Sequence, residues 1–340
     1  MKKLICYFVV ISALFAACEK SDDTPLNTRF DRHILPGYNI VAIAFDGQGN
    51  AWLGTFNSQP PMTFNLPQLI KYNLESGEMV VYDESNSLIQ PGMFIWSIVA
   101  DKKNNIWIGT DGLVKFDGET FTKFSSENSP IPVDFVNSVA VDSKDNIWFS
   151  SCSHLEGGFV KYNGTNFQVF TPDNSDLPQH GVRRVVIDRN DQVWLAQYGA
   201  IDRTLLVKYA GDTWTTYGHD QLGFTLPFWG DATLNSRNQV CGAIDYTLSY
   251  GTYDPRPQVI VFDGNDCKHL QFDDFSNPRA LAVDHDDNIW CVNQNLLAVY
   301  NGTNWLVDSL TFKDSGISTI AVSKNNKVWV GTADGVFINE

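Results

Sequence analysis

The sequence lacks several features that would assign a function directly. No G-x-S-x-G, H-E-x-x-H, Walker or Rossmann pattern occurs in the context that it requires, and no two cysteines have C-x-x-C spacing. Basic residues are scarce, since 24 Lys and Arg stand against 39 Asp and Glu and give a net charge of -15 at pH 7. An acidic surface repels phosphate backbones, so nucleic acid is not an expected partner.

The chain also has little apolar sequence of the length that a membrane span requires. Its longest such run, from Leu4 to Phe15, follows Lys2 and Lys3. It has about 12 residues, whereas a spanning helix needs about 20. Basic residues, a short apolar run and the small residues after it predict a secretory signal peptide over residues 1–17.

The residues Ala16-Ala17-Cys18 resemble the lipobox of bacterial lipoproteins, in which the cysteine is lipidated and becomes the first mature residue. Phe15 departs from the Leu that is usual in that family, which leaves plain cleavage and an uncleaved anchor as alternatives. Residues 18–27 form an acidic tether that resembles a surface-export tag, although an ordinary solvated tether has the same composition. We therefore expect a protein held at the outer membrane by a lipid anchor only, on the cell surface or on the periplasmic face.

Four further cysteines are scattered along the chain, at Cys152, Cys241, Cys267 and Cys291. Their wide spacing predicts buried free thiols, with one disulfide as the alternative. The same spacing argues against a metal cluster. No cofactor, no metal and no set of catalytic residues is expected.

A repeated motif runs through the rest of the chain. The repeat unit is an apolar strand, an Asp, three turn residues, an Asn, one apolar residue and a Trp, as in SVAVDSKDNIW. The copies end at Trp52, Trp107, Trp148, Trp194, Cys241, Trp290 and Trp329. The fifth copy lacks the Trp and the seventh lacks the Asp. Seven copies at intervals of 39 to 55 residues are typical of a propeller with one blade per copy.

Each copy contains the elements of a four-stranded antiparallel blade. The first stretch, such as residues 139–141, is apolar on both faces, as in an inner strand packed between blades. The Asp-to-Asn segment predicts a tight turn, the Trp lies on the second strand, and a turn such as Asp117-Gly118 follows the third. Residues 121–124 and 167–170 predict outer strands.

The two ends of the chain supply complementary parts of one blade. The last copy stops at Glu340 after its third strand, whereas residues 28–33 precede the first inner strand, where an outer strand belongs. We expect residues 28–33 to complete the seventh blade and close the ring, which removes open sheet edges. The expected fold is therefore an all-β, seven-bladed propeller over residues 28–340, cooperative and monomeric.

The pattern DGQGNAWLGT, repeated as DKKNNIWIGT and KNNKVWVGT, resembles the two-component-regulator propeller repeat. The resemblance implies the extracytoplasmic sensor half of such regulators, which often detects polysaccharide breakdown products. The repeats are also similar to those of the streptogramin (virginiamycin B) lyases, which use magnesium, His and Glu. The Glu-x-His order expected of those lyases is absent, and His154-Leu155-Glu156 has the reverse order, which favours an ordinary surface loop. Acidic turns such as residues 284–288 resemble calcium loops, but their recurrence favours a structural hairpin.

The fold class places a ligand where loops enter the inner strands and join second to third strands, around the central channel. Aromatic faces stack on sugars or apolar groups, and arginines bind carboxylates. The candidate residues of the entering loops are Phe94, Trp96, Phe135, His180, Arg183, Phe228, Trp229 and Arg279. A long insertion after the second strand of the fifth copy adds Tyr246, Tyr250, Tyr253 and Arg256. Plugging of the channel by these aromatic side chains is the alternative.

These features favour a non-enzymatic binding protein of the cell envelope that captures a glycan or a protein partner. One alternative is a metal-assisted lyase or hydrolase of the streptogramin-lyase class, which requires carboxylates clustered around a metal. A second alternative is a structural or assembly subunit of an envelope complex, which would present a flat aromatic face without a deep pocket.

Overall fold

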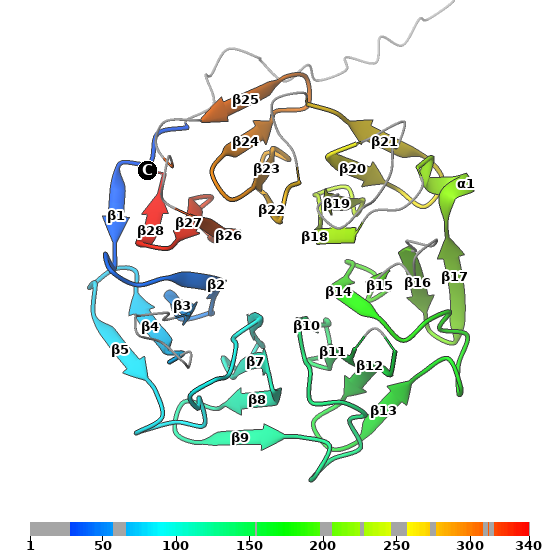
Figure 1. Cartoon of the computed structure of the whole chain (residues 1–340), viewed down its shortest axis with the longest axis horizontal. Coiled ribbons are helices and arrows are strands. Elements are labelled where there is room, and N and C mark those ends of the chain that lie inside the picture. The colour runs from blue at the N-terminus through cyan, green and yellow to red at the C-terminus, as the bar shows by residue number, and fades with distance from the viewer. Residues whose placement is uncertain are drawn as a thin grey trace, which may run out of the picture.

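Each sequence repeat forms a four-stranded antiparallel sheet, and the seven sheets stand around one axis as a β-propeller (Figure 1). The computed structural model describes residues 28–56, 66–153, 155–197, 206–224, 228–245, 257–272, 277–308, 312 and 316–339. The expected signal peptide, Cys18 and the tether lie outside these ranges. Within them, α1 (His219–Leu222) is a single turn, and no helix has the length and apolar character needed to cross a membrane.

The strands are numbered along the chain, and blade 1 begins with β2. The inner strands are β2 (Ile40–Phe45), β6 (Ser97–Ala100), β10 (Val139–Val141), β14 (Val182–Ile187), β18 (Phe228–Leu234), β22 (Ala280–Val283) and β26 (Ile317–Val322). The second strands are β3 (Asn50–Thr55), β7 (Ile106–Thr110), β11 (Ile147–Cys152), β15 (Val193–Gln197), β19 (Val240–Asp245), β23 (Ile289–Val292) and β27 (Val328–Thr332).

The third strands are β4 (Leu69–Asn73), β8 (Gly112–Phe116), β12 (Gly157–Tyr162), β16 (Leu206–Ala210), β20 (Val259–Phe262), β24 (Leu297–Tyr300) and β28 (Gly335–Ile338). The outer strands, on the periphery in Figure 1, are β5 (Met79–Tyr82), β9 (Phe121–Phe124), β13 (Phe167–Phe170), β17 (Thr213–Tyr217), β21 (Cys267–Leu270), β25 (Trp305–Asp308) and β1 (Arg32–Ile34). Strands β9 and β13 begin and end at the residues that the sequence predicts.

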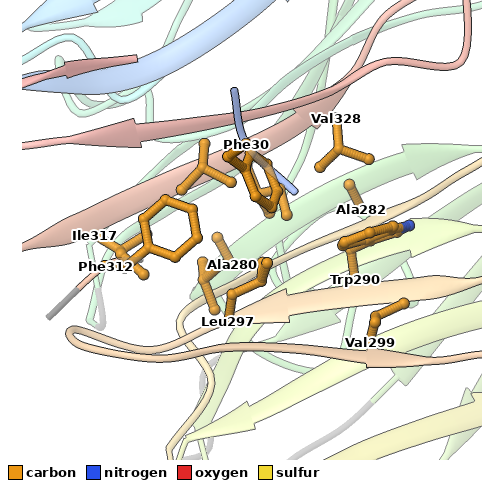
Figure 2. Packing of buried hydrophobic residues seen from close by; sticks show 12 residues of the cluster. Phe30, Ala280, Ala282, Trp290, Leu297, Val299, Phe312, Ile317 and Val328 are labelled. Atoms are coloured by element: carbon orange, nitrogen blue, oxygen red, sulfur yellow. The ribbon is translucent and has the colours of Figure 1, made fainter. Parts of the chain in front are cut away.

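The N-terminal strand closes the ring as expected. Strand β1 pairs antiparallel with β28, with Arg32 opposite Ile338 and Ile34 opposite Val336, so blade 7 contains both ends of the propeller. The strand starts later than the sequence predicts, because Phe30 is used for packing. Its ring meets Phe312 edge-on at a centroid distance of 5.0 Å, in the core between blades 6 and 7 (Figure 2).

The hydrophobic core consists of layers between neighbouring blades. Second strands such as β3 and β11 are buried at every residue, because blades cover both of their faces. In the layer between blades 6 and 7, Trp290 and Val328 pack with Phe30 and Phe312 (Figure 2). Since every blade contributes to two layers, the loss of one blade exposes apolar surface on both neighbours.

The spacing of Asp and Trp that recurs in five of the repeats has a structural cause. In blade 3, Asp142 accepts hydrogen bonds from the backbone N–H groups of Lys144 and Asn146 and from the Asn146 amide. Its second oxygen also accepts a bond from the Trp148 indole at 2.9 Å. Asp46, Asp101, Asp188 and Asp284 accept the corresponding indole bond. The turn Asp therefore holds the hairpin together, and protein donors occupy its carboxylate oxygens. We call the turn with its Asp and Trp the clasp of a blade.

The two irregular repeats keep the same hairpin, because other hydrogen bonds replace those of the missing Asp. In blade 5 an Asn replaces the Asp, and Asn235 donates from its amide to Gln239 at 2.8 Å, while Cys241 takes the place of the Trp and is fully buried. In blade 7 Ser323 accepts the bond from the Lys327 N–H with its hydroxyl. The hairpin thus tolerates smaller polar residues when the partners change with them.

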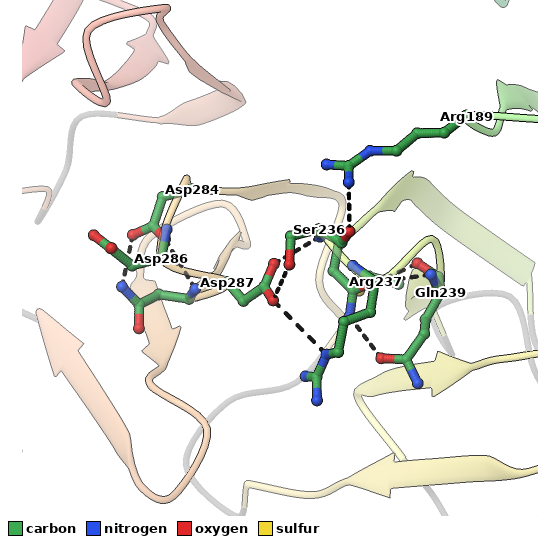
Figure 3. Close-up of polar contacts among 10 residues, drawn as sticks. Arg189, Ser236, Arg237, Gln239, Asp284, Asp286 and Asp287 are labelled. Atoms are coloured by element: carbon green, nitrogen blue, oxygen red, sulfur yellow. Dashed lines mark hydrogen bonds and ion pairs between the residues drawn. The ribbon is translucent and has the colours of Figure 1, made fainter. Parts of the chain in front are cut away.

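Hydrogen bonds also join each turn to the next blade. The residue after the turn Asp donates its backbone N–H to an Asn or Asp side chain three positions into the next turn, as from Ser236 to Asp287 at 2.7 Å (Figure 3). The same bond runs from Gly47 to Asn104, from Lys102 to Asp145, from Ser143 to Asp191, from Arg189 to Asn238 and from His285 to Asn326. We call these six hydrogen bonds staples, and they connect blades 1 to 7. The seventh junction has none, because Gly49 occupies the accepting position.

Candidate functional site

The mouth of the central channel is built by one residue from each blade. Four inner strands carry a β-bulge near their start, at Val41, Arg183, Gly230 and Ser318, where the register shifts by one residue. A bulge adds an unpaired residue and re-aims its side chain. Each lies five residues before the turn Asp or its replacement, and the same position in the other blades holds Trp96, Asn137 and Arg279. We call these seven residues the mouth ring.

The mouth ring surrounds a cavity of about 790 Å³. All seven of its members line this cavity, and the residues that follow them, such as Ser97, Ser138 and Thr319, form the wall beneath. A volume of this size is typical of sites for small molecules or short oligomers. A smaller depression of about 330 Å³ lies on the outer edge between blades 3 and 4, beside Phe170 and Trp214, away from the channel.

Aromatic rings form a continuous row across blades 1 to 3. Phe56 stacks on Phe94 at a centroid distance of 5.0 Å, and Phe94 stacks on Trp96 at 5.0 Å. Trp96 meets Phe135 edge-on at 5.7 Å. Phe94 and Trp96 are 39% and 38% exposed, so their rings are supported from the side and still offer surface. We call these four residues the aromatic row.

Charged side chains lie on the other half of the cavity wall. Arg183 of blade 4 and Arg279 of blade 6 belong to the mouth ring, and Asp245 ends β19 of blade 5. Below them, the Arg184 Nε lies 2.6 Å from an oxygen of Asp231.

The Arg184–Asp231 pair joins four blades. Arg184 also donates to the Asn137 carbonyl of blade 3 at 3.3 Å, and Asp231 accepts the Leu281 N–H of blade 6 at 3.2 Å. Both side chains are mostly buried, and their contacts connect neighbouring blades, so the pair has a structural role.

The described cavity wall consists of apolar and aromatic side chains, hydroxyl groups, one amide, arginines and aspartates. Among the described residues that line it, none is a His, Cys, Glu, Lys or Tyr. Cys152 ends the second strand of blade 3 on the same face, but burial raises the pKa of its thiol to about 12, so it is not a thiolate at neutral pH. No group of three or more His, Cys, Asp or Glu side chains in the described ranges is arranged to hold a metal ion.

The structure places the candidate residues of the sequence in different settings. Phe94, Trp96, Arg183 and Arg279 line the cavity together, and Phe135 joins them through its contact with Trp96. His180 instead donates from Nδ1 to the Gly157 carbonyl at 2.8 Å and ties blade 4 to blade 3. The remaining candidates of the long insertion, together with His154 and the side chain of Phe228, fall outside the described ranges: Tyr246, Tyr250, Tyr253 and Arg256.

Trp229 has a packing role. It is 2% exposed, belongs to the core layer between blades 4 and 5, and packs against Gly242, where any side chain would clash with the indole ring. All four cysteines after Cys18 are free thiols; Cys152, Cys241 and Cys291 are buried as the sequence predicts, whereas Cys267 is only partly buried. Burial raises the pKa of Cys241 and Cys267 to about 12.

Several residues of the site were missed by the sequence analysis. Phe56 starts a long insertion, and Asp245 ends a second strand, so neither lies in an entering loop. Asn137, Gly230 and Ser318 carry no aromatic ring or charge to draw attention. A simple signal was available, since every member of the mouth ring lies five residues before the turn Asp or its replacement.

The chain is similar to known proteins in its repeat sequence and in its fold. The family model for the two-component regulator propeller matches residues 34–57 and 89–112. Two blades carry that family's repeat. These segments include the clasps of blades 1 and 2 and the start of the aromatic row, and they confirm the resemblance read from DGQGNAWLGT and DKKNNIWIGT. A search of curated proteins gave no match.

Solved structures share the fold of the whole described chain. The extracellular domain of BT4673 from B. thetaiotaomicron, described as a one-component system, superposes with a TM-score of 0.65 at 16% identity, over 92% of this chain and 40% of that chain. Virginiamycin B lyase from Staphylococcus aureus gives a TM-score of 0.66 at 9% identity, over 89% and 94% of the two chains.

PorZ of Porphyromonas gingivalis, a surface component of the type-IX secretion system, gives a TM-score of 0.62 at 15% identity, over 87% of this chain and 46% of that chain. This chain therefore spans less than half the length of BT4673 and PorZ. At these identities the likeness to solved structures establishes the seven-bladed propeller fold. The similarity in sequence is to the two-component regulator propeller repeat, over residues 34–57 and 89–112.

Proposed function

We propose that this protein is a non-enzymatic binding protein of the cell envelope, which captures a saccharide at the mouth ring. The aromatic row carries the proposal. Phe94 and Trp96 stack on each other at 5.0 Å and keep more than a third of their surface exposed beside a cavity of about 790 Å³. Aromatic faces of this kind pack against the apolar faces of sugar rings at low entropic cost, because they are already ordered.

The wall chemistry supports binding over catalysis. Asp231 is committed to Arg184, so Asp245 is the remaining acid among the described lining residues, and one acid does not provide the pair that glycoside hydrolysis requires. A hollow mouth also disfavours an assembly subunit, for which a flat aromatic face is expected. Anchoring through Cys18 at the outer membrane is part of the proposal, and the signal peptide and lipobox-like residues support it.

The direct test is binding of the purified protein to a glycan array, beside a Phe94→Ala/Trp96→Ala variant. We expect binding to a defined glycan class and a loss of affinity of at least about tenfold in the variant, since central aromatic contacts dominate such sites. Leu306→Ala is the matched control, because Leu306 is 41% exposed on the outer strand β25 of blade 6.

Two results would count against the proposal. One is the absence of binding to every glycan on the array, which would favour a protein partner. The other is binding that the Leu306→Ala control weakens as much as the double variant does. Melting curves of both variants show whether the fold is intact.

A further inference from the structure

We propose that the captured saccharide is acidic, and that Arg183 and Arg279 bind its carboxylate. This inference rests on the proposed function and adds the chemical class of the ligand. It follows from the uneven distribution of aromatic and charged residues around the mouth ring.

The described part of the mouth carries an excess of one positive charge within an acidic protein. The chain carries a net charge of -15, yet the described cavity wall contains three arginines and two aspartates. Arg184 and Asp231 form an ion pair at 2.6 Å, and the other charged side chains of the described wall are Arg183, Arg279 and Asp245. A cavity with an excess of positive charge and low-dielectric walls concentrates anions, whereas the rest of the surface repels them.

The two arginines flank the blade that carries the smallest residue of the ring. Gly230 lies between Arg183 of blade 4 and Arg279 of blade 6 in ring order. Its backbone approaches the Pro278 carbonyl so closely that any side chain there would clash. At the level of the ring, blade 5 therefore contributes backbone alone between the arginines of blades 4 and 6.

The aromatic and cationic halves of the mouth fit two parts of one ligand. The aromatic row belongs to blades 1 to 3 and offers ring faces, whereas the arginines belong to blades 4 and 6. A guanidinium presents paired N–H donors that match a planar carboxylate. A uronic acid residue has both an apolar sugar face and a carboxylate, so it satisfies both halves at once.

The test uses oligosaccharides that differ only in charge. Calorimetric titration of the purified protein would compare uronate-bearing oligomers from pectin, alginate, hyaluronan and glucuronoxylan with their methyl-esterified or carboxyl-reduced forms. Neutral xylo- and manno-oligosaccharides and sulfated neutral oligosaccharides form two further arms. We expect at least one uronate oligomer to bind, and its neutral form to bind about tenfold to a hundredfold more weakly, as for the loss of a charge-assisted hydrogen bond.

The variant Arg279→Gln should weaken uronate binding by about tenfold or more and leave the affinity for the neutral form unchanged. Arg279→Lys keeps the charge but loses the paired donors, so an intermediate affinity is expected. Arg237→Gln is the matched control, since Arg237 is exposed on the opposite, turn-bearing face and lies 3.8 Å from Asp287. Affinity for the uronate should also fall as salt rises.

The outcomes separate this inference from the proposed function. Trp96-dependent binding of neutral glycans alone would overturn the acidic ligand and keep saccharide capture. Binding that prefers the sulfated arm, or that survives both esterification and Arg279→Gln, would overturn the carboxylate assignment. Failure of every saccharide to bind would overturn both.

Discussion

Seven turn residues with positive φ show how closely single positions are constrained. Asn104, Asp145, Asp191, Asn238, Asp287 and Asn326 have φ between 58° and 66°, and Gly49 has a φ of 85°. Asn and Asp are the residues other than glycine that adopt this conformation most readily. In six blades the side chain also accepts the staple from the preceding blade, so conformation and hydrogen bonding select the same two residue types. Gly49 satisfies the conformation alone.

The substitution Gly49→Asn should therefore stabilise the ring. Open space surrounds the position that a Cβ would take, and Asn tolerates the backbone conformation. Its amide oxygen would lie where the Lys324 N–H of blade 7 can donate to it, which adds about 0.5–1.5 kcal/mol. For a chain of this size we expect a rise in Tm of about 1–4 °C by calorimetry.

The reciprocal change Asn326→Gly is the control, because it removes the His285 staple at a position of the same kind. It should lower the Tm by a similar amount. An unchanged or lower Tm for Gly49→Asn would show that the staples do not contribute to stability.

At the scale of the element, the hairpin between inner and second strands is the unit that the sequence specifies best. The turn Asp, the Trp and the αL residue are all visible in the motif, so blade number, strand order and the outer strands β9 and β13 could be predicted. The bulges could not, because an extra residue in an apolar strand changes no pattern in the sequence. The mouth ring was therefore recognised only where a large or charged side chain, such as Trp96 or Arg279, occupied it.

The clasp also makes stability depend on pH. Burial of Asp142 opposes its ionisation, but the hydrogen bonds from Trp148, Asn146 and Lys144 outweigh it and hold the pKa below its usual value. Asp46 is shifted in the same direction for the same reasons. A lowered pKa in the folded state adds stability that is present above the unfolded pKa, near 4, and lost as pH falls through the folded value. The free energy of unfolding should thus be flat near neutrality and fall below about pH 4.

Asp142→Asn should flatten this acid dependence and cost about 1–3 kcal/mol at pH 7, because an amide N–H would face the donors of Trp148 and Asn146. Blade 5 supports this expectation, since its Asn235 occurs together with Gln239 and without a Trp. Denaturant unfolding at pH 3 to 7 measures the effect, with the exposed Asp173 changed to Asn as control. Equal acid dependence in the two variants would contradict the account.

At the scale of the whole molecule, an almost symmetric scaffold supports an asymmetric mouth. The clasps and staples repeat around the ring on one face, and closure by β1 holds the seven blades in fixed positions. On the other face the blades carry different residues at equivalent positions. Blades 1 to 3 supply aromatic rings, and blades 4 to 6 supply arginines and an aspartate. Because no repeat rule dictates these residues, the sequence pattern indicates which loops lie on this face but does not indicate which of their side chains meet.

A crystal structure of the protein with a bound oligosaccharide, obtained with the highest-affinity glycan of the array, tests saccharide capture at the mouth most directly. The account predicts a sugar ring against Phe94 and Trp96, with the rest of the ligand in the cavity of about 790 Å³. A saccharide seated in the depression between blades 3 and 4, or anywhere else away from the mouth ring, would contradict it.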